Sequence, residues 1–280
     1  MNTFHTPVML GEVIEGLDVR EGKKYIDATV GGGGHAQEII KRGGILLGID
    51  QDREALEFVK EGKLVWGNFR DIERIAKEND FDNVDGILFD LGVSSHQIDT
   101  PERGFSFRYP EAALDLRMDQ EEGIPAGEYI KKLSEEELYE IFTKFGEEKL
   151  ARAIAGAIVR SRRERPLTTV GDVVETVSLA VRDVRDRTST LARVFQALRI
   201  AVNDELGALK VGLRGAGEVL GSGGRLAVLS YHSLEDRIVK REIMKLGFKP
   251  INKRPITPSE NEIRENHRSR SAKLRVALKL

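Results

Sequence analysis

Short apolar segments alternate with helix-like segments through the first hundred or so residues, and this alternation constrains the fold more than any other feature of the chain. Strands separated by short helices are typical of a parallel sheet with helices packed on both of its faces. We therefore expect an α/β fold with a doubly wound, Rossmann-like core. The expected elements are strands at 24–29, 45–50, 64–66 and 84–91, and helices at 35–42 and 53–60.

The alternation stops after about residue 104, and a helical pattern replaces it. Ser134 and Glu137 have the spacing of a capping box, in which each side chain bonds the backbone of the other residue at a helix start. Apolar residues at helical spacing predict further helices from Leu150, from near Thr169, and in one long run over 191–213.

Strand patterns return at 224–231 and 273–280, so the helical region interrupts the α/β region instead of following it. We therefore expect two domains. The first is an α/β core formed by residues 1–104 and 205–280, and the second is an all-helical insertion formed by residues 105–204.

The chain of 280 residues contains no cysteine, which excludes disulfides, cysteine-ligated metal sites and a cysteine nucleophile. No metal is expected. The first 24 residues carry acidic side chains instead of a signal peptide's apolar run, and no stretch of 18 apolar residues is present. We therefore expect a cytoplasmic protein without a membrane partner.

The net charge of −2 conceals a strong sorting of charge along the chain. Residues 111–148 have a net charge of −8, whereas residues 149–165 and 251–280 each have a net charge of +5. The acidic stretch is typical of solvated helix faces. The two basic stretches favour an anionic partner about as strongly as they favour solvated faces.

A glycine cluster follows the first expected strand, where Gly31, Gly33 and Ala36 fit a dinucleotide-binding fingerprint with Asp50 nineteen residues after Gly31. Asp27, Asp50 and Asp90 all fall at or near ends of expected strands, where ligands of open α/β sheets bind. The pattern predicts a nucleoside cofactor, and S-adenosylmethionine suits it at least as well as NAD. The structural alternative is a glycine-rich turn with aspartate caps.

The chain resembles the RsmH (MraW) family of bacterial S-adenosylmethionine-dependent methyltransferases, which act on N4 of a cytidine in 16S ribosomal RNA. The matching segments run in family order over nearly the whole chain. They are HTPVML (5–10), DATVGGGGH (27–35), DGILFDLGVSS (85–95), RGFSF (103–107), LDLRMD (114–119), FQALRIAVNDEL (195–206), HSLEDRIVK (232–240) and RSRS (268–271).

The resemblance implies which residues hold S-adenosylmethionine. The glycine loop would contact it, an aspartate would hold the ribose, a phenylalanine would flank the adenine, and two polar residues would complete the pocket. These residues are Gly33, Gly34, His35, Asp50, Phe69, Asp90 and Gln97. The family also inserts a helical domain into the methyltransferase core. The chain departs from the family pattern at 189–194 and at His267, in segments where RNA contact is expected.

An exocyclic amine needs no covalent adduct, so the absence of cysteine favours methylation of N4 over methylation of carbon 5 of cytosine. The amine would attack the methyl group directly, in line. We expect Asp90, or a nearby backbone carbonyl, to hold the amine hydrogens. Ser94, Asn203 and His232 are weaker catalytic candidates, because Asn203 fits a structural hydrogen-bonding role and His232 fits a helix cap.

The substrate cytidine is expected to be presented unstacked, in 16S ribosomal RNA or the small ribosomal subunit. Candidate phosphate contacts come from the two basic stretches and are Arg160, Arg162, Arg163, Arg165, Arg268 and Arg270. Two other functions stay open at this stage. One is an NAD-dependent oxidoreductase, and the other is a non-enzymatic RNA-binding or ribosome-assembly module.

Overall fold

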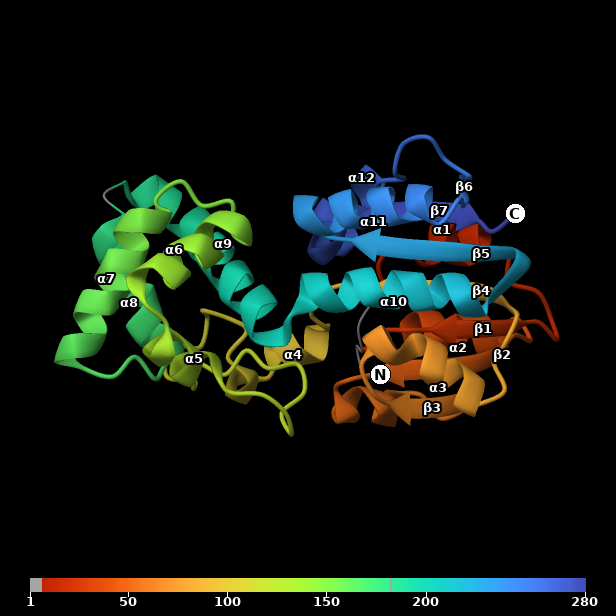
Figure 1. Ribbon diagram of the computed structural model, residues 1–280, viewed down its shortest axis with the longest axis horizontal. Coiled ribbons are helices and arrows are strands. Elements are labelled where there is room, and N and C mark those ends of the chain that lie inside the picture. The colour runs from red at the N-terminus through yellow and green to blue at the C-terminus, as the bar shows by residue number, and fades with distance from the viewer. Residues whose placement is uncertain (1–6, 182) are drawn as a thin grey trace. The chain divides into compact units, whose positions relative to one another are not determined.

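The computed structural model describes residues 7–181 and 183–280 (Figure 1). His5 and Thr6 of the first family motif therefore lie outside the described residues. The chain forms two compact units, Met1–Ser95 with Leu206–Leu280 and His96–Glu205, whereas the sequence led us to expect junctions at 104/105 and 204/205.

The segment just before residue 105 belongs to the second unit because of the contacts of Arg103. This side chain is only 1% exposed, and its Nη2 donates to the carbonyl oxygens of Met118 at 2.8 Å and Arg117 at 3.3 Å. The Arg103 carbonyl in turn accepts from the Leu116 N–H at 3.1 Å. These bonds attach the segment to the helical unit, and sequence patterning does not reveal them.

Seven strands of the first unit form one sheet in the order β3-β2-β1-β4-β5-β7-β6. The first five strands are parallel, as expected, but β7 pairs antiparallel with both β5 and β6. An apolar run looks the same in either direction, so its pattern does not fix strand direction. The strands are β1 Lys24–Asp27, β2 Ile45–Asp50, β3 Lys63–Trp66, β4 Val84–Asp90, β5 Leu220–Ser230, β6 Lys249–Pro250 and β7 Lys273–Leu278.

Helices cover both faces of the sheet because its central strands are apolar on both sides (Figure 1). In β4, Ile87 and Phe89 pack on one face with α3 (Ile72–Glu78), α10 (Glu205–Val219) and α11 (Ser233–Lys245). Leu88 packs on the other face with α1 (Leu10–Leu17) and α2 (Gly34–Lys41). The short helices α12 (Glu260–Glu265) and η4 (His267–Ser271) precede β7.

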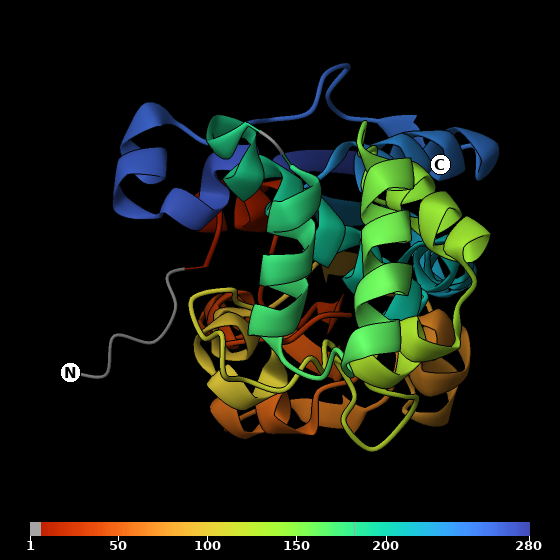
Figure 2. The ribbon, with the colours of Figure 1, turned by 90° about the vertical axis from the view of Figure 1, so that its left-hand side faces the viewer.

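The second unit is a helical bundle (Figure 2). It has its own apolar core, which includes Phe142, Ile154 and Leu198. The predicted capping box is present, with Ser134 and Glu137 bonded to each other's backbone. The unit's α-helices are α4 Ser95–Asp99, which starts at the junction, α5 Ala126–Lys132, α6 Glu135–Lys144, α7 Ala151–Glu164, α8 Val170–Ala180 and α9 Val184–Asn203, and η3 Pro101–Arg103 is a single 3₁₀ turn.

Two expected helices differ in the structure. The segment expected as a helix at 53–60 is a 3₁₀ helix, η1 (Arg53–Phe58), started by Asp52, whose side chain accepts from the Glu54 N–H. The long helix expected over 191–213 is two helices, α9 and α10, because Asp204 has φ of 47°. A left-handed residue cannot continue a right-handed helix.

Candidate active site

Three aspartates end neighbouring parallel strands and therefore meet at one edge of the sheet. Strand β1 lies between β2 and β4, and Asp27, Asp50 and Asp90 are their last residues. Asp27 is 1% exposed, and its Oδ1 accepts from the Thr29 N–H at 3.1 Å. Burial, with smaller contributions from the negative charges of Asp90 and Asp50, raises the pKa of Asp27 to about 7.

The glycine loop between β1 and α2 fits closely against its surroundings, which is why it needs glycine. Gly31 and Gly33 have φ of 51° and 75°, a conformation that L side chains rarely adopt. A Cβ at Gly33 would lie 2.6 Å from a methyl carbon of Val59, and one at Gly34 would lie 2.8 Å from Pro7. The loop therefore presents bare backbone beside the aspartates, where a ligand can approach closely.

The Asp50 carboxylate is oriented by backbone N–H groups. Its Oδ2 accepts from Gly31 at 2.8 Å, and its Oδ1 accepts from Asp52 at 2.8 Å. A carboxylate offers about four acceptor positions on its two oxygens. Asp50 is thus a fixed acceptor next to the glycine loop, as a residue that binds the two hydroxyls of a ribose must be.

Asp90 is held by residues from three other parts of the first unit. Its backbone N–H donates to the Thr29 hydroxyl at 2.6 Å, and the Tyr231 hydroxyl donates to Asp90 Oδ1 at 2.7 Å. His35 Nδ1 lies 3.5 Å from Asp90 Oδ2, while His35 Nε2 lies 3.1 Å from the Val8 carbonyl oxygen. A carbonyl only accepts, so Nε2 carries a proton in this pairing.

Tyr231 belongs to the site although sequence reasoning did not select it. Burial, followed by the negative charge of Asp90, raises the pKa of Tyr231 well above its usual value of 10. The phenol therefore stays protonated and acts as a donor, not as a base. It directly follows Ser230, the last residue of β5, so the rule that selected the aspartates also points to Tyr231.

Two further expected site residues also lie in the first unit. The Ser94 Cβ would be 3.7 Å from a Cβ placed on Gly31, so this serine lies beside the glycine loop. Phe69 follows β3, and its half-buried ring packs edge-on against Phe89 with centroids 5.5 Å apart. Gly212 of α10 leaves room for Phe69, because a Cβ there would lie 2.9 Å from that ring.

The remaining catalytic candidates have structural hydrogen bonds. Asn203 Nδ2 donates to the carbonyl oxygens of Leu116 and Arg199 at 2.8 and 2.9 Å, so both of its amide hydrogens are used. His232 is the N-cap of α11, and its Nδ1 accepts from the Glu235 N–H at 3.4 Å. Gln97 is buried in α4 and belongs to the helical unit, not to the unit that carries the aspartates.

The candidate RNA-binding arginines differ in their exposure and in the partners they have within the protein. Arg162 donates to the Ile130 carbonyl, and Arg165 is ion-paired with Glu175 and lies 3.6 Å from Asp172. Arg160 and Arg163 are exposed on the last turns of α7. Arg268 and Arg270 are also exposed, but they lie on η4 in the other unit.

Within residues 7–181 and 183–280, no three His, Asp or Glu side chains are grouped as ligands for a metal ion. In the same part of the chain, no helix combines the length and the hydropathy needed to cross a membrane.

Comparison with known proteins gives matches over the full chain. The model of the MraW methylase family matches residues 2–280. Proteins named ribosomal RNA small subunit methyltransferase H are 43% identical to the chain, in Symbiobacterium thermophilum over 100% of this chain and 98% of the relative. The relative from Carboxydothermus hydrogenoformans is also 43% identical, over 100% of this chain and 99% of its own length. Among solved structures, TrmN from Thermus thermophilus matches with 14% identity and a TM-score of 0.47, over 100% of this chain and 50% of that chain.

Proposed function

The chain belongs to the MraW methylase family, and from this premise we propose that it transfers a methyl group from S-adenosylmethionine to N4 of a cytidine in 16S ribosomal RNA. The membership confirms the resemblance predicted from the sequence motifs. Neither the NAD-dependent oxidoreductase nor the non-enzymatic module finds support. Because the proposed substrate is a ribosomal RNA, we place the activity in the cytoplasm.

One observation carries the cofactor assignment. Asp27 is fully buried beside two further carboxylates, and no cationic side chain of the described residues pairs with it. A buried carboxylate without a positive partner is costly, so a positively charged ligand would stabilise this edge of the sheet. S-adenosylmethionine has a positive sulfonium and a positive amino group. NAD lacks such a pair of charges, which is why the geometry favours the methyl donor.

The residues at the sheet edge fit the parts of this cofactor. Asp50 would accept hydrogen bonds from the ribose hydroxyls, and Gly33 and Gly34 would allow the backbone to approach the amino-acid part. As the family resemblance implies, Phe69 would flank the adenine, His35 would contact the cofactor together with the glycine loop, and Asp90 would help to complete the pocket. When bound, the cofactor supplies a methyl group on a positively charged sulfur, which is open to attack by a nucleophile.

Asp90 is the residue we assign to the substrate amine. The Tyr231 hydroxyl and the Thr29 side chain fix its position, and a fixed carboxylate can accept the amine hydrogens of cytosine. Holding those hydrogens turns the nitrogen lone pair out of the ring and toward the methyl group. With the cofactor bound, the amine nitrogen would bond to the methyl carbon as the S–C bond breaks, and Asp90 or water would take the amine proton. No covalent enzyme adduct is required.

We assign substrate recognition to the helical insertion together with the basic segments. Arg160 and Arg163 are its strongest phosphate contacts, because both are exposed, whereas Arg162 and Arg165 have partners within the unit. Arg268 and Arg270 would contact phosphates from the other unit. Contacts of this kind make binding of RNA weaken steeply as salt rises. A flat salt dependence would contradict these assignments.

Transfer of tritiated methyl from S-adenosylmethionine to small ribosomal subunits, compared with free 16S RNA, tests the proposed function. We expect the wild-type protein to label a cytidine at N4, and Asp90→Ala to lose most of the labelling at saturating cofactor. Asp82→Ala, which removes an exposed carboxylate of the same unit, is the matched control. Full activity of Asp90→Ala would disprove the assignment of Asp90, and no labelling by the wild type would disprove the function.

A further inference from the structure

The basic side chains of helix α11 are exposed, whereas its acidic side chains are not. Its exposed residues contain four basic side chains and no carboxylate, and they are Ser233, Arg237, Lys240, Arg241, Met244 and Lys245. The three acidic residues of the helix, Glu235, Asp236 and Glu242, are instead buried or half-buried. We name the set Arg237, Lys240, Arg241 and Lys245 the α11 basic face.

Each acidic residue of α11 is engaged in holding the fold. Glu235 Oε2 accepts from the Tyr231 N–H at 2.7 Å, which fixes the start of the helix beside the candidate active site. Asp236 is ion-paired with Arg275 of β7 at 2.6 Å. Glu242 is 4% exposed and is paired with Arg214 and Lys245 at 3.3 and 2.7 Å. Glu242 thus neutralises Lys245 at the end of the helix, whereas none of these carboxylates is paired with Lys240 or Arg241.

In helices α3 and α6, a surface lysine is paired with a carboxylate one turn away. In α3, Lys77 lies 2.6 Å from Glu73, and in α6, Lys144 lies 2.8 Å from Glu140. In α11 the corresponding spacing joins like charges, with Arg237, Arg241 and Lys245 following one another at intervals of four residues. Like charges at this spacing repel each other and destabilise a helix. The stability of a solvated helix therefore does not explain this arrangement.

The ion pairs of α11 do not include Lys240 or Arg241, and neither residue has an ion-pair partner among residues 7–181 and 183–280. The positive surface continues onto two neighbouring elements. On α10, Arg214 is paired with Glu242 while its side chain stays 61% exposed. Strand β6 packs beside α11 and carries the exposed Lys249. A polyanion is the partner whose charge complements such a surface.

We propose that the α11 basic face binds the phosphate backbone of the ribosomal RNA that carries the target cytidine. Helix α11 starts at Ser233, directly after Tyr231 and His232 at the site edge, and continues for 13 residues, which is about 20 Å of helix. RNA flanking the target nucleotide can therefore follow the helix away from the site. Flexible lysine and arginine side chains recognise phosphate charge and not base identity, so this contact adds affinity without sequence specificity.

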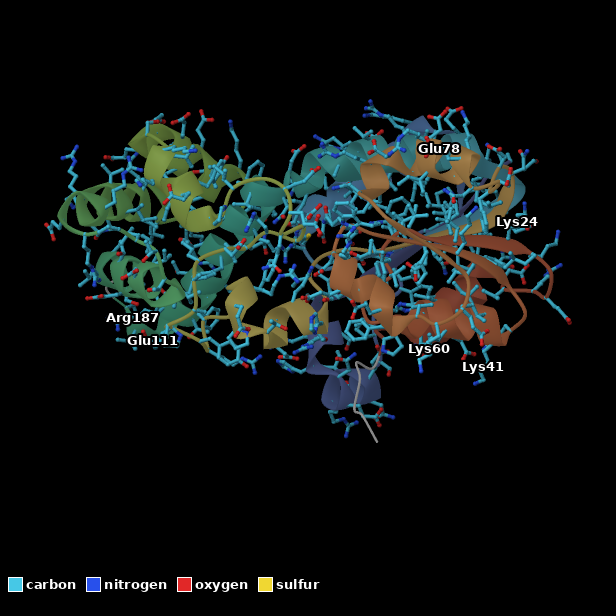
Figure 3. All side chains as sticks on the ribbon, turned by 90° about the horizontal axis from the view of Figure 1, so that it is seen from below. Lys24, Lys41, Lys60, Glu78, Glu111 and Arg187 are labelled. Atoms are coloured by element: carbon cyan, nitrogen blue, oxygen red, sulfur yellow. The ribbon has the colours of Figure 1, made fainter. Side chains whose placement is uncertain are left out.

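The test compares two double variants with the wild type. Lys240→Gln/Arg241→Gln removes two charges from the α11 basic face. Lys41→Gln/Arg42→Gln removes the same charge from the end of α2, on the other face of the sheet, where Lys41 points outward (Figure 3). Binding of a 16S ribosomal RNA transcript is measured over a range of salt concentrations, with S-adenosylmethionine affinity and methyl transfer measured alongside.

We expect the α11 variant to raise the Kd for RNA about tenfold and to reduce the slope of log K against log salt by about 1.4, the share of two phosphate contacts on single-stranded RNA. Its KM for RNA should rise, while cofactor affinity and kcat at saturating RNA stay unchanged. The α2 variant should match the wild type. Unchanged RNA binding in the α11 variant, or an equal loss in the α2 variant, would overturn the proposal.

The proposal rests on the proposed function for the identity of the RNA, but the two fail separately. A wild-type protein that binds the transcript through α11 and transfers no methyl group would refute the function alone. Methyl transfer with normal RNA affinity in the α11 variant would refute the α11 contact alone. Binding of phosphatidylglycerol vesicles that depends on Lys240 and Arg241, with RNA binding unaffected, would assign the face to a membrane and also overturn the proposal.

Discussion

The two units each contain a buried carboxylate, but only the one in the helical unit has a cationic partner. In the helical unit, Glu148 has a side chain that is 1% exposed, and it is paired with Arg193 at 2.7 Å and accepts from the Leu150 N–H at 2.8 Å. At the edge of the sheet, Asp27 is equally buried, yet its charge faces other carboxylates and no cation among the described residues.

We propose that this difference separates a charge that only holds the fold from one that serves a ligand. A buried charge with its partner inside the same unit is complete once the chain has folded. A buried charge without a partner raises the energy of the folded protein and is retained where a ligand supplies the missing charge. The contrast predicts that removing the unpaired charge of Asp27 stabilises its unit, whereas removing the partner of Glu148 destabilises the helical unit.

Asp27→Asn should stabilise the protein at about pH 8, by on the order of 2–4 kcal/mol. The folded-state pKa of Asp27, about 7, lies above its unfolded value of 3.8, so the folded protein binds more protons and loses stability as pH rises between these values. The asparagine variant lacks this loss and should match the wild type at about pH 4. Urea unfolding at several pH values measures the difference in free energy of unfolding between the variant and the wild type. An asparagine variant less stable than the wild type at pH 8 would contradict the contrast between the two units.

Arg193→Ala should destabilise the helical unit by about 2–3 kcal/mol, because it leaves the buried Glu148 charge without its partner. Arg185→Ala is the control, since Arg185 pairs with Asp183 on the surface with its side chain 89% exposed. That change should leave the urea midpoint at the wild-type value, because a pair on the surface is screened by water. Equal midpoints for the two variants in urea unfolding would show that the Glu148 pair is not a structural requirement.

Asp50→Ala should weaken binding of S-adenosylmethionine by about 2 kcal/mol, roughly thirtyfold, because the ribose loses a charged acceptor. Calorimetric titration measures this affinity, with Asp82→Ala as the control on the same unit. The thermal midpoint of the variant without ligand is measured in parallel. If Asp50→Ala bound S-adenosylmethionine with wild-type affinity, Asp50 would not be the residue that holds the ribose.

Tyr231→Phe should have the smallest effect, a loss of about 1 kcal/mol or roughly fivefold in methyl transfer, since Asp90 loses one of the groups that hold it. If Tyr231 acts by positioning Asp90, as we propose, the loss should be found in kcat and in its pH profile, with cofactor affinity preserved. An unchanged pH profile would show that the hydroxyl has no influence on Asp90.

Features with a short sequence range were predictable from the chain. The strand at 45–50 and the capping box at Ser134 and Glu137 appear as expected, because neighbouring residues determine them. The three aspartates were also predictable, since parallel strands end at one edge. The break at Asp204 was not, because the apolar spacing of α9 continues past it into α10.

The contacts that complete the site depend on residues far apart in the chain. Tyr231 and Asp90 are separated by 141 positions, and no local pattern joins them. The same holds for Arg103, whose burial and carbonyl partners move the start of the helical unit to His96. Local patterning thus predicts at which edge of the sheet the aspartates gather, but tertiary packing decides which other side chains contact them.

Proton release on binding S-adenosylmethionine tests most directly whether the ligand completes the Asp27 site. A positive ligand beside Asp27 must lower the pKa of that carboxyl, so binding near pH 7 should release about half a proton. Calorimetric titration in two buffers of different ionisation enthalpy measures this number, and Asp27→Asn should release none from this position. Binding without proton release in the wild type, or with the same release in the variant, would contradict the account.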